Sequence, residues 1–320
     1  MLILSPRRRP SVHRQSQRND APAAKLSAGL AASGLALALG LGGCSSSWST
    51  VTATQVSSVP ARAGEPLRLE AANGSVKIEP WDQSTAEITA RISAQSSERL
   101  NATEIRAEPL PGGGLHVFAV FPPPGRKNAE GCAFTIRMPA TGETTIRTSN
   151  GSIELSGGRG LASLETSNGS ITLSDRDGPA VLDTSNGRIV VENLTGNLEA
   201  DTSNGSIRIV NAGGAVDVSS TNGSAFVSLA PSSNGPVDVD TSNGSIEFRA
   251  PASFAGAIEL DRSNGRSRVH QAGKLVFSTR GDSHYGDGPR RARLDTSNGN
   301  IDVYLEAPDH SEPAPKPNSN

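Results

Sequence analysis

The feature that most constrains the fold of this chain is a four-residue phrase, Thr-Ser-Asn-Gly, which recurs along the sequence and is usually followed by Ser-Ile or Arg-Ile. A looser copy surrounds Asn73. The asparagines of the other copies, some with the first two residues varied, are Asn150, Asn168, Asn186, Asn204, Asn222, Asn243, Asn264 and Asn298. They are 18 residues apart four times, and then 21, 21 and 34 residues apart. A fixed period of this length indicates stacked supersecondary units.

The composition supports a thin, repetitive structure. Aromatic residues make up only 3% of the 320 residues, and the chain contains 34 glycines, which argues against a thick globular core. Without residues 1–43 the chain has 24 basic and 31 acidic side chains, a net charge of −7. Such a body gains nothing from counterion release at phosphates, so nucleic acid is not expected as a partner.

The N-terminus has the composition of a secretory signal. Residues 1–25 are polar and basic, Leu26–Gly43 is apolar, and Cys44 follows Leu-Gly-Gly. This ending resembles the lipobox of bacterial lipoproteins, so residues 1–43 are interpreted as a lipoprotein signal peptide and Cys44 as the acylated first residue of the mature chain. The alternative is one transmembrane helix, because 18 apolar residues lie at the short end of what spans a bilayer. Ser45, in place of an aspartate, resembles lipoproteins of the outer membrane.

Four further segments follow from composition and periodicity. Residues 44–63 are rich in Ser, Thr, Val and Pro and are predicted to be a flexible tether. Residues 64–140 alternate apolar and polar residues over short runs, which predicts a β-rich N-terminal cap in which Glu98–Glu108 is loop or irregular strand. Residues 141–306 contain the repeats. Residues 307–320 hold four prolines and no apolar pattern, and are predicted to be disordered.

Two all-β architectures explain the repeat, which reads Leu-x-Thr-x-Asn-Gly-x-Ile-x-Leu and changes the parity of its apolar positions across Asn-Gly. In the first, Asn-Gly is the type I′ turn of repeated antiparallel hairpins. In the second, Asn-Gly is a corner of a parallel β-solenoid with coils of about 18 residues, and inward Thr and Asn side chains form ladders at the ~4.8 Å strand spacing. The solenoid is favoured because the hairpin gives no reason for the repeated Thr and Ser.

The eight asparagines from Asn150 to Asn298 are therefore assigned as a structural ladder. The longest interval in the series lies between Asn264 and Asn298. Within it, Ser278–Gly281 is interpreted as a decayed copy of the repeat.

Several of these segments together resemble a known family. They are the stretch Asn73–Ile78 with Trp81-Asp82 after it, the strand Phe134–Pro139, and the train of Asn-Gly-x-Ile units. They resemble a bacterial β-strand-repeat family named putative adhesin, a numbered domain of unknown function related to the head domain of putative auto-transporter adhesins. The resemblance covers about residues 60–306 and implies a repeated β architecture. It also implies an adhesin-like role, but no specific activity.

Few residues in the sequence suggest chemistry. The histidines show no metal spacing, and no catalytic residue, metal site or cofactor is predicted. Cys132 is unpaired if Cys44 is acylated, and is interpreted as a small buried side chain. Arg280-Gly281-Asp282 matches the integrin-binding tripeptide, a match short enough to arise by chance. Five acids, each two residues before the Ser of its repeat, are placed on an outward, solvated face: Glu165, Asp183, Asp201, Asp240 and Asp295.

The functional hypothesis at this point is a non-catalytic, lipid-anchored protein of the bacterial cell envelope, with an adhesin-like or scaffolding β-repeat surface. Its expected partners are the membrane, through an acylated Cys44, and an envelope protein or glycan. The alternative is a glycan- or lipid-binding carrier or enzyme with its site in the irregular segment 265–293. A pocket with convergent polar residues in that segment would favour the alternative.

Overall fold

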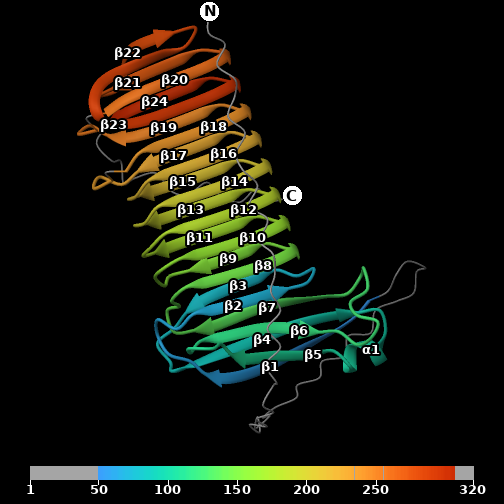
Figure 1. Cartoon of the computed structure of the whole chain (residues 1–320). Helices are drawn as coiled ribbons and strands as arrows, with labels where there is room; N and C mark the ends of the chain where they lie inside the picture. Colours follow the sequence, from blue (N-terminus) through green and yellow to red (C-terminus); the bar gives the residue numbers. More distant parts are fainter. Residues whose placement is uncertain (1–49, 234, 255, 307–320) are drawn as a thin grey trace, which may run out of the picture. The chain divides into compact units, whose positions relative to one another are not determined.

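The computed structural model describes residues 50–306 except 234 and 255 (Figure 1). All of these residues belong to the larger of two compact units of the chain, Gly34–Asn320. The predicted signal peptide 1–43, Cys44 and the tail 307–320 lie outside the described residues. The described chain folds into two large sheets, here named A and B, with one short helix.

Sheet A has 13 strands. In spatial order these are β1 (Val51–Pro60), β4 (Thr85–Ala94), β7 (Gly131–Met138), β3 (Val76–Pro80), β9 (Ile153–Ser156), β11 (Ile171–Arg176), β13 (Ile189–Leu194), β15 (Ile207–Ala212), β17 (Ala225–Leu229), β19 (Ile246–Pro251), β24 (Ile301–Glu306), β21 (Ser267–Gln271) and β22 (Lys274–Thr279).

Sheet B has 11 strands. In spatial order these are β20 (Gly256–Asn264), β23 (Ser283–Asn298), β18 (Val237–Asn243), β16 (Val216–Asn222), β14 (Leu198–Asn204), β12 (Ala180–Asn186), β10 (Ala162–Asn168), β8 (Thr144–Asn150), β2 (Leu67–Ala71), β6 (Leu115–Val120) and β5 (Glu104–Pro109). The helix α1 (Ser97–Asn101) lies between β4 and β5 in the chain.

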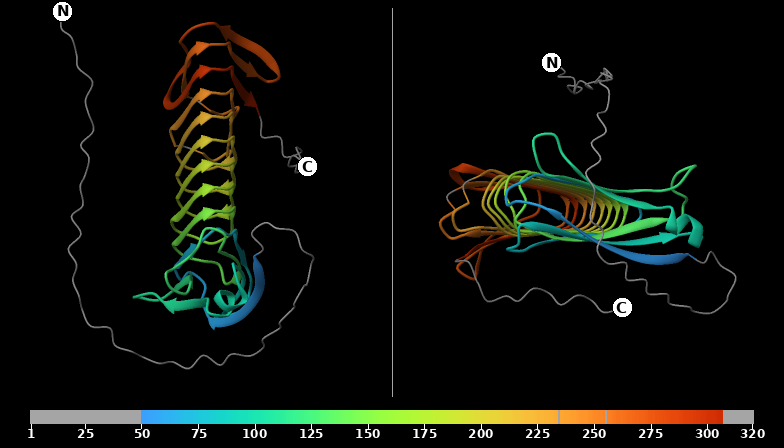
Figure 2. Two further views of the ribbon diagram at one scale, coloured as in Figure 1. Left: turned by 90° about the vertical axis from the view of Figure 1, so that its right-hand side faces the viewer. Right: turned by 90° about the horizontal axis from the view of Figure 1, so that it is seen from below.

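Each coil contributes one strand to each sheet, and equivalent residues of successive coils lie side by side (Figures 1 and 2). Leu164 pairs with Leu182, and Asn168 with Asn186, in a parallel ladder between β10 and β12. Neighbouring strands from β8 to β18 repeat this arrangement. The prediction of a parallel β-solenoid is therefore confirmed. The hairpin alternative is wrong, because Asn-Gly joins strands of different sheets.

The core runs between the two sheets and is built from the apolar positions of the repeat. Leu164 is 1% exposed, and Ile171 and Leu173 are fully buried, on either side of the Asn-Gly corner. The chain turns at this corner from sheet B into sheet A, so the parity of the inward positions must change there. Each such side chain contributes roughly 1.5–3 kcal/mol through burial, and the aliphatic stack needs few aromatics.

The coils at both ends of the stack are out of chain order. The coil β2–β3 lies between β6–β7 and β8–β9, and the coil β23–β24 lies between β18–β19 and β20–β21. The 34-residue interval between Asn264 and Asn298 is thus a return path. The interpretation of Ser278–Gly281 as a decayed copy is wrong, since Ser278 and Thr279 end β22 and form an antiparallel pairing with β21.

Antiparallel strands lie beyond the parallel coils at each end. The strand β4 pairs antiparallel with both β7 and β1, and β5 pairs with β6. At the other end β22 pairs with β21, and the first residues of β23 pair with β20. These strands cover the hydrogen-bonding edges that the last parallel coils would otherwise leave open.

Two sequence predictions need correction. Val51–Pro60 was assigned to the flexible tether, but it forms β1, with alternating exposed and half-buried side chains, and pairs with β4 over its whole length. Ala53 and Val59 pack against the core, so one face of the strand points inward. Glu98–Glu108 was assigned as loop or irregular strand, but it contains part of α1, capped by Ser96, and most of β5.

Within the described residues, no helix is long and apolar enough to cross a membrane.

Candidate functional site

The repeat asparagines form a ladder on the outside of the stack. Asn186 donates its amide N–H to Oδ1 of Asn168 at 3.0 Å and accepts from Asn204 at 3.0 Å. The same bond joins Asn150, Asn222 and Asn243 to their neighbours. All of these side chains are exposed, so the expectation that they point inward is wrong. Only the coil-to-coil bonding of the amides matches the sequence argument.

The two ends of the ladder follow the order of the coils. Asn298 bonds to Asn243 at 3.1 Å, and Asn264 bonds to Asn298 at 3.0 Å, so Asn264 is the last rung. At the other end Asn150 donates to Asn73, whose own amide donates to the main-chain oxygens of Asn128 and Glu130. The ladder therefore spans all coils from β2–β3 to β20–β21.

The inward residue of the phrase is its threonine. Thr184 is 1% exposed and donates its hydroxyl to the main-chain oxygen of Gly169 in the preceding coil at 3.0 Å. Gly187 is required by close approach, since a Cβ atom there would lie 1.9 Å from that same oxygen. The threonine, asparagine and glycine of the phrase are thus all used in holding coil to coil.

A second ladder, not foreseen from the sequence, lies at the corner where the chain turns from sheet A back to sheet B. Asn193 donates to Asp175 at 2.7 Å, and Asn211 donates to Asn193 at 2.8 Å. All three have positive φ, between 54° and 61°, which short polar side chains tolerate best. Their 18-residue spacing was the signal that could have revealed them.

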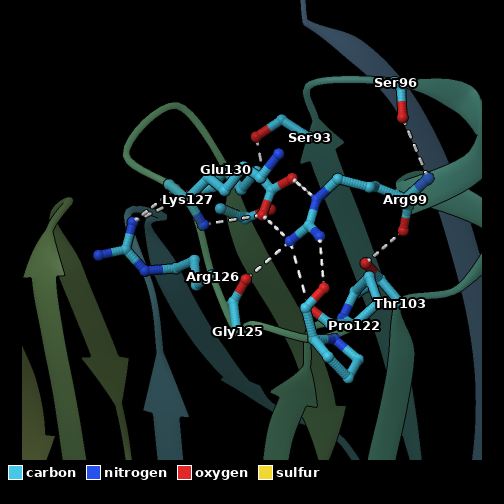
Figure 3. A network of polar contacts seen from close by, with 11 residues as sticks. Ser93, Ser96, Arg99, Thr103, Pro122, Gly125, Arg126, Lys127 and Glu130 are labelled. Atoms are coloured by element: carbon cyan, nitrogen blue, oxygen red, sulfur yellow. Dashed lines mark hydrogen bonds and ion pairs between the residues drawn. The ribbon is translucent and has the colours of Figure 1, made fainter.

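A loop beside the first coils is fixed by a buried ion pair that sequence reasoning also missed (Figure 3). Arg99 of α1 contacts both carboxylate oxygens of Glu130, at 2.5 and 2.8 Å, and donates to the main-chain oxygen of Gly125 at 2.7 Å. The main-chain N–H of Lys127 donates to Glu130 at 2.9 Å. The hydrogen bond from Arg99 lowers the pKa of the Glu130 carboxyl to about 2. This network positions the loop and leaves the carboxylate no exposed surface.

The outer face of sheet B is acidic. The five predicted outward acids lie on it, exposed or half-buried, and a second row beside them holds Glu199, Asp217 and Asp238. Partial burial, together with the carboxylates of Glu199 and Asp183, raises the pKa of Asp201. Burial and Asp295 likewise raise the pKa of Asp240. The rows concentrate negative charge on one face.

A groove of about 540 Å³ crosses the beginnings of β12, β14, β16 and β18 and the second half of β23. Proline and valine side chains line it together with charged groups of both signs. The outward side chains among them are those of Val181, Glu199, Asp217, Asp238, Arg291 and Arg293. A shallow, repeated surface of this kind can bind an extended partner, but it brings together no nucleophile and base.

The segment 265–293 contributes Arg291 and Arg293 to this groove, and its turn between β22 and β23 is held by a residue of the preceding coil. Buried Arg262, from the coil before it, donates to the main-chain oxygens of Thr279 and Gly281 at 2.7 and 3.2 Å. Its main-chain N–H donates to Asp282 at 3.1 Å. Two members of the integrin-type tripeptide, Gly281 and Asp282, therefore hold the turn between β22 and β23.

The remaining candidates for chemistry are structural. Cys132 is fully buried and free, and burial raises the pKa of its thiol to about 12, which removes the reactive thiolate. Across the described part of the chain, no three His, Cys, Asp or Glu side chains are placed to hold a metal ion.

Comparison with known proteins gives only distant likenesses. No model of a protein family matches the chain, and no curated protein sequence matches it. Among solved structures it is similar to a putative adhesin from Bacteroides fragilis, with 11% identity, 78% of this chain and 97% of that chain covered, and a TM-score of 0.38. It is also similar to a putative cell adhesion protein from Clostridium sporogenes, with 14% identity, 80% and 100% covered, and a TM-score of 0.24.

Proposed function

We propose that this chain is a non-catalytic protein of the bacterial cell envelope, anchored by lipid at Cys44, whose stacked coils present an extended binding surface for adhesion or scaffolding. The anchor places the chain at a membrane, with the outer membrane as the expected address. The partner bound by the exposed faces is an envelope protein or a glycan.

The observation that carries this proposal is that inward and corner residues of each coil hold the stack together, while outward residues form its surface. The inward residues and the residues of both corners bond to the neighbouring coil, as Thr184, Asn186 and Gly187 do. The outward residues of each strand are left to vary, and they build the acidic face and the groove of sheet B. A rigid frame with variable outer rows supports binding to an extended partner without requiring catalytic geometry.

Binding is tested with beads coated with the purified chain, carrying Cys44→Ser to prevent acylation, on intact Gram-negative cells. We expect saturable binding that free chain competes away. Binding should fall when the groove acids are neutralised together as Glu199→Gln, Asp217→Asn and Asp238→Asn, because these side chains line the groove. The matched control is Glu192→Gln on sheet A. Binding no greater than that of albumin-coated beads would contradict the proposal.

The anchor is tested separately. In the chain expressed with its N-terminus intact, Cys44→Ser should abolish incorporation of labelled fatty acid and move the protein out of the membrane fraction, since the thiol is the acylated group. Cys132→Ser is the control and should leave labelling unchanged. A Cys44→Ser chain that is still cleaved and still fractionates with membranes would refute the lipid anchor.

A further inference from the structure

The groove on the outer face of sheet B lies along two rows of side chains. The residues of each row come from β12, β14, β16, β18 and β23, which follow one another in the sheet (Figure 1). The first row, named here the groove row, contains Val181, Glu199, Asp217, Asp238 and Arg293 in register. The second row lies two residues earlier in each segment and contains Pro179, Asn197, Ala215, Pro236 and Arg291. Its proline and alanine side chains are short, so they leave space beside the acids.

The three acids of the groove row repel one another. Glu199 lies opposite Asp217, and Asp217 lies opposite Asp238, at the strand spacing of about 4.8 Å. Like charges placed in this way destabilise a sheet. Asp238 has Arg293 opposite it, but within the described residues no cation pairs with Glu199 or Asp217. Burial raises the pKa of Asp238, Arg293 lowers it, and Asp217 raises it again. A cation brought to this row would therefore relieve a repulsion that the fold leaves in place.

The acids of the groove row occupy only three neighbouring strands. On the side of β10 the row continues with Ser163, opposite Val181. On the other side Arg293 belongs to β23, which lies out of chain order. Pro236 lies in the first interval of 21 residues between repeat asparagines. The groove thus forms where the chain departs from its regular repeat, whereas acids needed only for solubility have no reason to be confined there.

The two ends of the groove row limit the chemistry of an occupant. At one end Val181 is 39% exposed and offers an apolar contact. At the other end stand Arg293, which donates to Asp295 at 2.9 Å, and Arg291, both of which would repel a further cation. A polyamine carries cations along its whole length and cannot satisfy both ends. A peptide can place an apolar side chain over Val181 and basic side chains over the acids.

The spacing of the groove row fits an extended peptide that runs along the stack. Three strand spacings separate Val181 from Asp238, which is about 14 Å. Side chains on one face of an extended peptide recur at roughly 7 Å, so three successive ones span the same length. The first then lies at Val181, the second between Glu199 and Asp217, and the third at Asp238.

We propose that the groove binds an extended segment of a protein partner that carries an apolar residue followed by basic residues two and four positions later. The inference rests on the proposed function as a binding surface and names the chemistry of the partner of sheet B.

The test is fluorescence anisotropy of a labelled peptide, Leu-Thr-Lys-Thr-Lys-Ser, with the purified chain carrying Cys44→Ser. We expect saturable binding that weakens as salt is added, because exposed charges are screened. Glu199→Gln and Asp217→Asn should each weaken binding by up to about fivefold, the effect of losing one exposed ion pair. Val181→Ser should also weaken it. The matched controls are Glu192→Gln and Val56→Ser, which make similar changes on sheet A and should change nothing.

A charge exchange separates binding from a loss of folding. The double variant Glu199→Lys and Asp217→Lys should reject the lysine peptide and bind an analogue in which glutamate replaces both lysines. Circular dichroism shows whether this variant is folded. Because neutralising the acids relieves repulsion, the single variants Glu199→Gln and Asp217→Asn should be no less stable than wild type.

Four results would overturn the inference. They are the absence of saturable binding to the lysine peptide, equal losses in Glu199→Gln and Glu192→Gln, a folded charge-exchange variant that still prefers the lysine peptide, and equal displacement of the peptide by spermine at matched charge. The last would mean that the face attracts any polycation. Bead binding to cells that survives protease but is lost after periodate oxidation of surface glycans would assign the groove to a glycan, and would also overturn it.

The inference and the proposed function fail separately. Cell binding by beads that persists in a chain without peptide binding would contradict the inference alone. Peptide binding by a chain whose beads do not bind cells would contradict the adhesive function alone.

Discussion

At the scale of single residues, the repeat phrase divides its tasks by side-chain size and polarity. The threonine reaches inward to a carbonyl oxygen, as Thr184 does to Gly169 at 3.0 Å, while the asparagine bonds sideways on the exposed surface. The glycine allows the two coils to approach. The contributions to stability differ in size. An exposed hydrogen bond between amides competes with water, whereas a steric overlap with the main chain can be relieved only by moving the coils apart.

The glycine and the asparagine of one corner therefore give a graded prediction. Gly187→Ala should destabilise the chain by about 3 kcal/mol or more, because the new Cβ would overlap the main chain of the preceding coil. Asn186→Ala should cost about 1 kcal/mol, the net value of exposed hydrogen bonds to two neighbours. Ser185→Ala, at the exposed position beside them, is the control and should cost less than about 0.5 kcal/mol. Urea titration measures all three, and a Gly187→Ala chain as stable as Ser185→Ala would contradict the close approach.

At the scale of elements, the ends of the stack depend on residues outside the repeat. The hairpin β21–β22 turns at Ala272-Gly273, whose φ values are 50° and 71°. Both positive values are those of a type I′ turn, which favours Asn-Gly. The loop that precedes β7 depends instead on the contact between Arg99 and Glu130. Neither device repeats along the chain, so periodicity could not reveal them.

The turn can be improved by substitution. Ala272→Asn should raise stability by about 0.5–1 kcal/mol, because asparagine tolerates the left-handed conformation that costs alanine free energy. Lys274→Asn, the control, adds the same side chain at an exposed position with no positive φ and should have little effect. The measurement is the midpoint of urea unfolding. A loss of stability in Ala272→Asn would mean that the turn is not of this type.

The ion pair between Arg99 and Glu130 predicts that the stability of the fold depends on pH. The pKa of Glu130 is lowered from 4.5 to about 2 in the folded chain, so its ionised form stabilises the fold above pH 4.5. That contribution is lost as the pH falls from about 4.5 to about 2. Wild type should therefore melt well above Glu130→Gln at neutral pH, and the difference should shrink across this window. A difference that stays constant from neutral pH to about pH 2 would contradict the assignment to the ionised carboxylate.

At the scale of the whole molecule, the sequence predicted the stack but not its order. The coils from Asn150 to Asn243 could be predicted because one pattern specifies both the strands and their parallel register. The reversal of order that places Asn298 between Asn243 and Asn264 depends on long-range pairing, on which a local pattern is silent. The outward direction of the asparagines was missed because sequence spacing does not determine which way a corner residue points. The first acidic row was predicted, whereas the second row, with Glu199, Asp217 and Asp238, was not.

A deletion that tests this architecture has to spare the buried side chain of Arg176. Arg176 is 1% exposed and donates to several main-chain oxygens of neighbouring coils, including those of Gly157 at 3.1 Å and Arg159 at 2.7 Å. Burial lowers its pKa to about 10, so it stays charged at neutral pH. A deletion that removed Arg176 would leave these oxygens without a donor. The next unit, Asn186–Ser203, contains no such buried arginine. Its deletion joins Ser185 directly to Asn204.

The most direct test of the account is the comparison of two deletions within this unit by urea unfolding and circular dichroism. Removal of the 18 residues Asn186–Ser203 should leave a folded, cooperatively unfolding chain, because Asn204 and Asn211 then stack on Asn168 and Asp175. Removal of only Asn186–Leu194 should abolish cooperative folding, because strands of sheet A would then lie in the place of strands of sheet B and face the wrong way. Equal tolerance of the two deletions would contradict a stack of 18-residue coils.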